Sequence, residues 1–257
     1  MINQRFNMEF EVHYHEVNPK EQAAPLAILH YLEDAAISHS ESIGQGIKQL
    51  QAKKQAWILN QWILQMNRYP VLGEKVMIET WSSGFERFYA NRDFLIKDNN
   101  QEILGKATSL WIFYNTESKR PSRIPQEFQE AYGIDPIRVI EDAANQFQIH
   151  EVGDQAQAVD NEQIFTVRRS DIDTNGHVNN ANYLQWMLEV VPEDVYQNAY
   201  LAAMKITYRK AATYGSSIRS KCHEAESKAN TPIYQHVILE NDDLQELATA
   251  LTVWKSV

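Results

Sequence analysis

The chain is almost free of cysteine, because Cys222 is the one such residue among 257. A single thiol excludes an intrachain disulfide and any zinc or iron–sulfur site built from several cysteines, and it fits a reducing cytoplasm. Long apolar runs are also missing, since Gln, Asn or Lys interrupts each candidate before it reaches the roughly 18 residues of a membrane span. These absences argue against a membrane role.

An excess of basic residues is absent as well. The formal net charge is −10, whereas a protein that binds nucleic acid generally needs a basic face to neutralise phosphates. We therefore expect no nucleic-acid partner, and we expect neither a metal ion nor a cofactor. The beginning of the chain alternates polar and apolar side chains without a basic region followed by an apolar one, so it predicts a first strand rather than a secretory signal.

The two halves of the chain repeat one pattern, in which a strand, an amphipathic helix and several strands follow one another. The matching residues are Tyr31-Leu32 with Tyr183-Leu184, Gly73 with Gly215, and Ala107-Thr108 with Ala248-Thr249, at offsets of 152, 142 and 141. A nearly constant shift indicates an internal duplication of a unit of roughly 120 to 140 residues.

Apolar periodicity places the elements of each half. In the first half a helix is expected from Pro25 to about Gly44 or Gly46, followed by strands at 56–67, 74–82, 88–97 and 102–115. In the second half the expected elements are a strand at 163–169, a helix at 181–191, and strands at 202–210, 216–224, 231–239 and 246–255.

A segment rich in Pro, Glu, Gln and Ala separates the halves. We expect a first domain at 1–125, a linker at 126–160 and a second domain at 161–257. A helix followed by antiparallel strands, given twice, predicts an α+β fold with two tandem domains, each an antiparallel sheet wrapped around a long helix.

The most distinctive stretch is 169–180, which packs carboxylates, carboxamides and an imidazole into one turn. Asp173 offers an anionic base or nucleophile, His177 a titratable partner, and Asn175 neutral donors and an acceptor. Gly176 permits a bend with unusual dihedral angles, so that its polar neighbours can converge. These residue types are those that an acyl-transfer site requires.

A helix expected directly after this turn adds donors. Free backbone N–H groups at a helix start, here those of Val178, Asn179 and Asn180, stabilise a developing oxyanion. Asn179, Asn180 and Asn182 are candidates for the helix cap. The same Asp, Asn and Gly residues are also the commonest turn formers, so ordinary capping is the competing interpretation.

The whole chain resembles the acyl-acyl-carrier-protein (acyl-ACP) thioesterases of bacteria and plant plastids, which are built as tandem hot-dog domains. The residues that carry the resemblance are Asn67-Arg68-Tyr69-Pro70 with Gly73-Glu74, Glu79-Thr80-Trp81-Ser82-Ser83-Gly84, Asn91-Arg92-Asp93, Ser109-Leu110-Trp111, Pro121-Ser122-Arg123-Ile124-Pro125, and Ser170 to Asn180 with Tyr183 and Trp186.

The resemblance implies a catalytic group of Asp173, Asn175 and His177. It also implies hydrolysis of a fatty acyl group from the phosphopantetheine thiol of ACP, which ends or diverts fatty acid synthesis, with the first domain shaping the acyl pocket. Plastid relatives begin with a transit peptide that this chain lacks, so we expect a bacterial, cytoplasmic enzyme. Two paired units permit a monomeric pseudo-dimer, and a homodimer is equally open.

One departure concerns a glutamate that relatives commonly carry just after the segment that reads Tyr208-Arg209-Lys210 here. This chain has Ala211 and Ala212 instead, and neither side chain can accept a proton. Asp171 and Glu189 are the carboxylates that we consider as substitutes. Cys222 is better explained as inert packing than as a nucleophile.

Two further groups of residues carry hypotheses. We expect an acyl pocket lined by Leu29, Leu32, Trp57, Leu59 and Trp62, for which plain core packing is the competing interpretation. We also expect docking of the acidic carrier protein by Lys119, Arg120, Arg168 and Arg169, for which solvated surface charge is the competing interpretation.

Two alternative functions stay open at this point. Hot-dog enoyl-thioester hydratases or dehydratases also use an Asp-to-His loop beside a helix, with four residues between the two, whereas three separate Asp173 from His177. A non-catalytic acyl-thioester-binding protein would bind the thioester and leave it intact.

Overall fold

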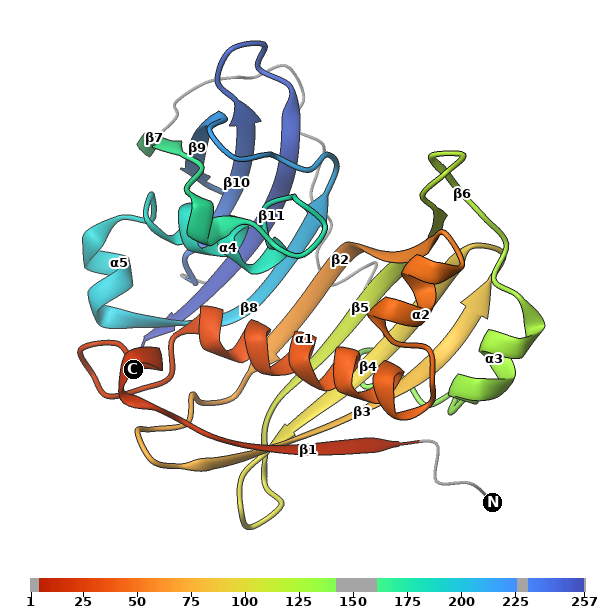
Figure 1. Ribbon diagram of the computed structural model, residues 1–257. Helices are drawn as coiled ribbons and strands as arrows, with labels where there is room; N and C mark the ends of the chain where they lie inside the picture. Colours follow the sequence, from red (N-terminus) through yellow and green to blue (C-terminus); the bar gives the residue numbers. More distant parts are fainter. Residues whose placement is uncertain (1–4, 142–160, 226–230, 257) are drawn as a thin grey trace. The chain divides into compact units, whose positions relative to one another are not determined.

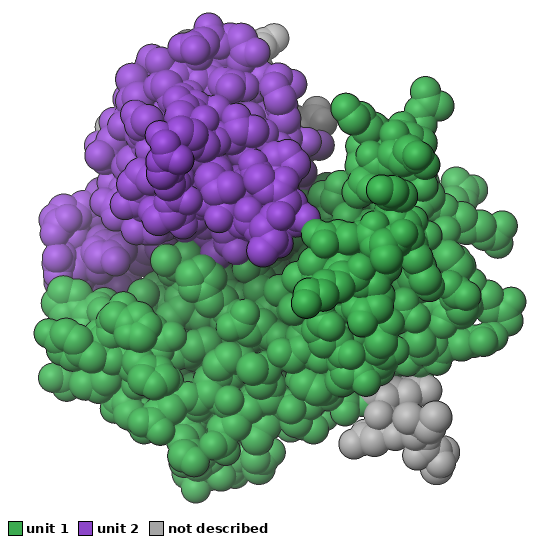
Figure 2. Space-filling view, in the orientation of Figure 1, with its two compact units in different colours: residues 1–141 green, residues 142–257 purple. Residues whose placement is uncertain are grey.

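The computed structural model describes residues 5–141, 161–225 and 231–256. Contacts along the chain divide it into two compact units, Met1–Glu141 and Asp142–Val257, which Figure 2 colours separately. No helix in the described residues combines the length and hydropathy that a membrane crossing requires.

The first unit is an antiparallel sheet with its long helix on one face (Figure 1). Its strands are β1 (Phe6–Glu11), β2 (Gln55–Met66), β3 (Lys75–Glu86), β4 (Tyr89–Lys97) and β5 (Ile103–Asn115). They run in the order β1-β3-β4-β5-β2, and the short strand β6 (Arg120–Pro121) pairs with β5. Its helices are η1 (Tyr14–Glu16), α1 (Pro25–Ser42), α2 (Ile47–Ala52) and α3 (Gln126–Tyr132).

The apolar side of α1 forms the core of this unit. Pro25 stands at the first helical position, where a missing N–H is harmless, and the helix then buries Ile28, Leu29 and Leu32 completely. The helix predicted from Pro25 and the strands predicted after it are confirmed, with ends that differ by a few residues.

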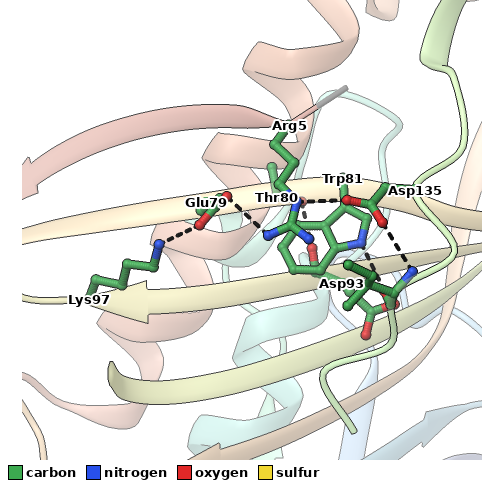
Figure 3. A network of polar contacts seen from close by, with 8 residues as sticks. Arg5, Glu79, Thr80, Trp81, Asp93, Lys97 and Asp135 are labelled. Carbon is green, nitrogen blue, oxygen red and sulfur yellow. Dashed lines mark hydrogen bonds and ion pairs between the residues drawn. The ribbon is translucent and has the colours of Figure 1, made fainter. Parts of the chain in front are cut away.

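The chain beyond α3 lies against β3 and β4 of the first unit rather than leaving it at once. Figure 3 shows Arg5 between Glu79 and Asp135, with Nε of Arg5 at 2.7 Å from the Asp135 carboxylate. Trp81 donates its indole N–H to the Ile137 carbonyl oxygen at 2.9 Å. Part of the segment expected to link the halves therefore packs on the first sheet, while 142–160 lies outside the described residues.

Asp93 makes this packing electrostatic as well as apolar. Its side chain is fully buried, it accepts the Val139 N–H at 3.0 Å, and it pairs with Nε of Arg138 at 3.1 Å. Burial raises the pKa of Asp93, and the contacts with Ser83, Arg138 and Val139 oppose that rise. A carboxylate in this position depends on the segment that covers it.

The second unit repeats the design with shorter helices (Figure 1). Its strands are β7 (Asn161–Thr166), β8 (Ala199–Tyr208), β9 (Ser217–Glu224), β10 (Ile233–Glu240) and β11 (Glu246–Ser256). They run antiparallel in the order β8-β11-β10-β9-β7. The helices are η2 (Arg169–Asp171), α4 (Asn180–Leu188) and α5 (Glu193–Asn198). The α+β class with two sheet-and-helix units is confirmed.

The duplication is confirmed, and the structure corrects its register near the helices. The short helices η1 and η2 and the bridges Val17–Ala23 and Ile172–Val178 are each 155 residues apart. Tyr183 therefore corresponds to Ile28, and the match of Tyr31 with Tyr183 at 152 is wrong. Gly73 and Gly215 do correspond, because their N–H groups donate to Val12 and Val167.

The offset changes along the chain, in large part because α1 has 18 residues and α4 has 9. In the sheets it falls to about 142, as the start of β3 at Lys75 and of β9 at Ser217 shows. Leu104 and Leu247 accept the same pair of backbone bonds and so correspond. Ala107 accordingly matches Ala250 rather than Ala248.

Candidate active site

The polar turn of the second unit is closed by backbone hydrogen bonds. The N–H of Asp173 donates to the His177 carbonyl oxygen at 2.8 Å, and the N–H of Gly176 donates to the Asp173 carbonyl oxygen at 3.1 Å. Gly176 has a φ of 78°, in the left-handed region that favours glycine. The turn thus brings Asp173, Asn175 and His177 together on one short loop, as their spacing predicts.

The Asp173 carboxylate is fixed by this turn. Its Oδ1 accepts the N–H groups of Asn175 at 2.8 Å and His177 at 3.2 Å, while Oδ2 accepts the side-chain amide of Asn175 at 3.3 Å. Asp173 is half-buried, whereas Asn175 and His177 are exposed. Oδ1 is committed to the turn, and Oδ2 retains the capacity to accept a proton from water or substrate.

The N–H groups expected to receive an oxyanion are mostly engaged. Val178 donates to the Ala212 carbonyl oxygen at 3.0 Å, and Asn179 donates to the Asp171 carbonyl oxygen at 2.8 Å. Asn179 is the helix cap, since its Oδ1 accepts the Ala181 N–H at 2.8 Å. This leaves the N–H of Asn180, which finds no acceptor in the described parts of the chain.

Asp171 lies beneath the loop and has a partner of its own. Its buried carboxylate accepts the Arg168 N–H at 2.7 Å and pairs with the Arg168 guanidinium, whose NH2 group lies 2.9 Å from Oδ1. This two-pronged contact anchors the start of the loop. An Asp171 carboxylate so engaged is poorly placed to act as a base.

Glu189 lies at the opposite end of α4 from the loop, as its exposed C-cap residue. A helix of nine residues is about 13 Å long, so a carboxylate at its end cannot reach Asp173. Ala211 is exposed and Ala212 is buried, and the backbone of Ala212 touches the loop through Val178.

The residues expected to form an acyl pocket lie in the core of the first unit. Leu29, Leu32, Leu59 and Trp62 are buried there, and Trp62 packs on Phe94 with ring centres 5.1 Å apart. Trp57 belongs to a separate aromatic cluster with Phe113 and Tyr132. The indole N–H groups of Trp57 and Trp62 have no hydrogen-bond partner within the described residues.

The residues expected to dock a carrier protein are all exposed, two in each unit. Lys119 and Arg120 lie at the turn before and within β6. Arg168 is engaged with Asp171, and the Arg169 guanidinium lies 4.6 Å from the centre of the Tyr214 ring. Of the four, Arg168 is the only one whose charge an ion pair engages within the part of the chain that the structure describes.

The structure adds one residue to which the sequence assigned no role. The hydroxyl of Tyr183, on α4, accepts the Ala212 N–H at 2.8 Å. Burial raises the pKa of Tyr183 to about 12; the Ala212 N–H opposes that rise, and the charges of Glu240 and Asp173 add to it. The phenol is therefore neutral at physiological pH, and it lies close enough to Asp173 to sense its charge.

Comparisons with known proteins cover both units. A family model described as the acyl-ACP thioesterase N-terminal domain matches residues 3–132, and one described as the C-terminal domain matches residues 154–256. No group of His, Cys, Asp and Glu side chains suited to hold a metal ion occurs in residues 5–141, 161–225 and 231–256.

Similar proteins carry related names. The chloroplastic dodecanoyl-[acyl-carrier-protein] hydrolase of Umbellularia californica is 27% identical over 97% of this chain and 67% of its own length. The solved 12:0-ACP thioesterase from the same species is 27% identical, with a TM-score of 0.87 over 99% of this chain and 95% of that one. A putative oleoyl thioesterase from Lactobacillus plantarum is 22% identical, with a TM-score of 0.87 over 98% and 96% of the two chains, and supports the fold.

The two family models together span most of the chain, one on each sheet-and-helix unit. The hot-dog arrangement that the resemblance implies for both units agrees with these solved structures. The chain therefore belongs to the acyl-ACP thioesterase family of thioester hydrolases.

Proposed function

We propose that this chain hydrolyses fatty acyl-ACP to free fatty acid and ACP, and that Asp173, Asn175 and His177 form its active site. The observation that carries the assignment is the Asp173 carboxylate, which two backbone N–H groups orient while Oδ2 stays available. A base must be held in place before its proton affinity matters, and this loop holds one.

In the proposed step, Oδ2 of Asp173 takes a proton from a water molecule as the water oxygen adds to the thioester carbonyl carbon. The carbonyl oxygen becomes an oxyanion, for which the N–H of Asn180 is available. When the carbonyl reforms, the carbon–sulfur bond breaks and the thiol leaves with a proton supplied by His177 or solvent. A thiolate is a good leaving group, so positioning supplies much of the required catalysis.

General-base action fits Asp173 better than direct attack by its carboxylate. Two N–H bonds to Oδ1 hold the carboxylate in the turn, where Oδ2 can accept a proton from a water molecule without leaving its place. The side chain is half-exposed, so water reaches it without any rearrangement. Asn175, which donates to Oδ2 at 3.3 Å, keeps the carboxylate plane in one orientation.

The decisive experiment is product analysis with a series of acyl-ACP substrates of increasing chain length. The purified protein should release free fatty acid and the ACP thiol in equal amounts, with a maximum at one range of chain lengths that reports the depth of the pocket. Hydration of an enoyl-ACP without thiol release would assign the alternative hydratase activity. Stable binding of acyl-ACP without turnover would assign the non-catalytic function.

The acyl pocket and the docking residues are part of the same proposal. We propose that the fatty acyl chain is accommodated in the first unit by Leu29, Leu32, Leu59 and Trp62 of its core and by Trp57 of the aromatic cluster, and that Lys119 and Arg120 with Arg168 and Arg169 attract the acidic carrier. Exposed charges are screened by salt, so KM for acyl-ACP should rise with ionic strength while kcat changes little. A KM independent of salt would remove the docking assignment.

A further inference from the structure

The segment between β8 and β9 passes beside the candidate active site and is held there by few bonds. Its ends are fixed, because Lys210 donates to Leu247 and Gly215 donates to Val167. Between these ends Ala212 makes two contacts with the site: its carbonyl oxygen accepts the Val178 N–H at 3.0 Å, and its N–H donates to the Tyr183 hydroxyl at 2.8 Å.

These two hydrogen bonds connect α4 to the catalytic loop, from Tyr183 through Ala212 to Val178, and we call this connection the relay. Tyr183 is 1% exposed and Ala212 is 3% exposed, so the bond between them is shielded from water. The Tyr183 ring is fixed by edge-on contacts with Trp186 and Tyr208, each with ring centres 5.6 Å apart. Val178, at the other end of the relay, directly follows His177.

The first unit contains the same segment without this bond. Its Pro70 accepts the Ala23 N–H at 2.8 Å, just as Ala212 accepts the Val178 N–H. Proline has no N–H to satisfy, and the helix position that corresponds to Tyr183 is Ile28, which has no hydroxyl. The hydroxyl and the N–H thus occur together in the unit that carries Asp173 and His177, and neither occurs in the other.

We propose that Tyr183 is a positioning residue of the active site, whose hydroxyl holds the Ala212 segment and, through it, the backbone of Val178 and His177. This proposal rests on the proposed function for its effect on turnover, but not for its effect on structure. Without the hydroxyl, Ala212 would keep a buried N–H that lacks an acceptor, and the segment would move to satisfy it.

The first test needs no substrate. Amide hydrogen exchange should show the Val178 N–H exchanging about 10-fold faster in Tyr183→Phe than in the parent, because the acceptor of that N–H is no longer fixed. The Ala23 N–H, which has the same kind of bond in the first unit, should be unchanged. Equal exchange of Val178 in parent and variant would overturn the proposal, even if the parent hydrolysed no thioester.

The second test measures turnover of acyl-ACP. Tyr183→Phe should lower kcat on the order of 10-fold, because a small displacement of catalytic groups slows the reaction strongly. It should leave KM within about 2-fold of the parent value, because the substrate contacts persist. The matched control is Tyr31→Phe, which removes the hydroxyl of a buried tyrosine that donates to Glu16 at 2.7 Å in the first unit. That control should leave kcat unchanged.

A rescue variant separates positioning from direct catalysis. The double variant Tyr183→Phe with Ala212→Pro removes the unpaired N–H and copies the arrangement of Ile28 and Pro70 in the first unit. It should restore slow exchange of Val178 and bring kcat to within about 3-fold of the parent. A double variant that stays as slow as Tyr183→Phe would show that the hydroxyl acts on the reaction in another way, and would overturn the proposal.

Discussion

The two units contain one loop built twice, with different side chains. In the first unit Oδ1 of Asn18 accepts the N–H groups of Lys20 at 2.9 Å and Gln22 at 3.1 Å. In the second unit Oδ1 of Asp173 accepts the N–H groups two and four residues later, at 2.8 and 3.2 Å. Even the left-handed residue is shared, as Glu21 in one and Gly176 in the other.

The comparison separates what the fold requires from what the chemistry requires. A side-chain oxygen at the δ position suffices to close the turn, and asparagine and aspartate supply it equally well. Only aspartate can take a proton from water, and Lys20 and Gln22 replace the amide and imidazole of Asn175 and His177. The turn geometry by itself is therefore no sign of catalysis.

The strongest test converts the second loop into the first. Asp173→Asn should keep the turn and the melting temperature, because the amide oxygen accepts the same two N–H groups, yet it should lower kcat by on the order of 10² or more. Free fatty acid release from acyl-ACP measures the effect. The reverse change in the first unit, Asn18→Asp, is the control and should leave kcat unchanged. Parental turnover in Asp173→Asn would make the catalytic assignment wrong.

The next largest effect concerns the buried imidazoles and the pH dependence of stability. In this respect the two units should behave alike. Burial, with the nearby Arg92 charge, lowers the pKa of His39 to about 3, and burial, with His223, lowers that of His236 to about 3. Below the ordinary value near pH 6.5 the unfolded chain binds a proton that the folded chain refuses. Each neutral imidazole therefore contributes fully to the free energy of unfolding above that pH. This contribution is lost as the pH drops toward 3.

Each imidazole should contribute a slope of up to about 1.4 kcal/mol per pH unit in this window. Urea unfolding between pH 7 and pH 4.5 measures the total, and His39→Gln or His236→Gln should each remove about half of the slope that the pair contributes. If one variant flattened the dependence of the free energy of unfolding on pH and the other did not, the two cores would differ in their access to water. That result would contradict the expectation that the two units behave alike.

The smallest expected effect concerns the left-handed turn residue. A Cβ at Gly176 would meet no atom within 4 Å, so Gly176→Ala tests the φ of 78° alone. It should lower the free energy of unfolding by about 1 kcal/mol. Glu21→Gly in the first loop should change that free energy by less than about 0.5 kcal/mol, because relief of strain is offset by a more flexible unfolded chain. Chemical denaturation of both variants measures these two changes in the free energy of unfolding.

Local patterns were enough to predict much of this molecule. Apolar periodicity predicted α1, α4 and the strands, and the Asx-rich stretch predicted the turn at Asp173 and offered Asn179 as one of three candidates for the helix cap. The turn is a local structure, in which donors and acceptors are at most four residues apart, so sequence alone reveals it.

What the sequence could not show depends on contacts between distant residues. The bond between Tyr183 and Ala212 joins residues 29 positions apart, and no periodicity encodes it. The register error near the first helix has a similar origin, because two tyrosines resemble each other while the backbone bonds that define equivalence are invisible. The engagement of Asp171 with Arg168 is a local contact, three positions along the chain, and it was missed because the sequence analysis gave each residue a separate role, Asp171 as a substitute carboxylate and Arg168 as a docking residue.

The covering of Asp93 has a consequence for any attempt to isolate the first unit. A fragment that stops at Pro125, or even at Tyr132, would lack Arg138 and the Val139 N–H. The Asp93 carboxylate would then be buried without its partners. It would also unmask the indole edge of Trp81. The smallest piece able to fold alone must therefore reach past Val139, and shorter pieces should gain solubility from a neutral side chain in place of the aspartate.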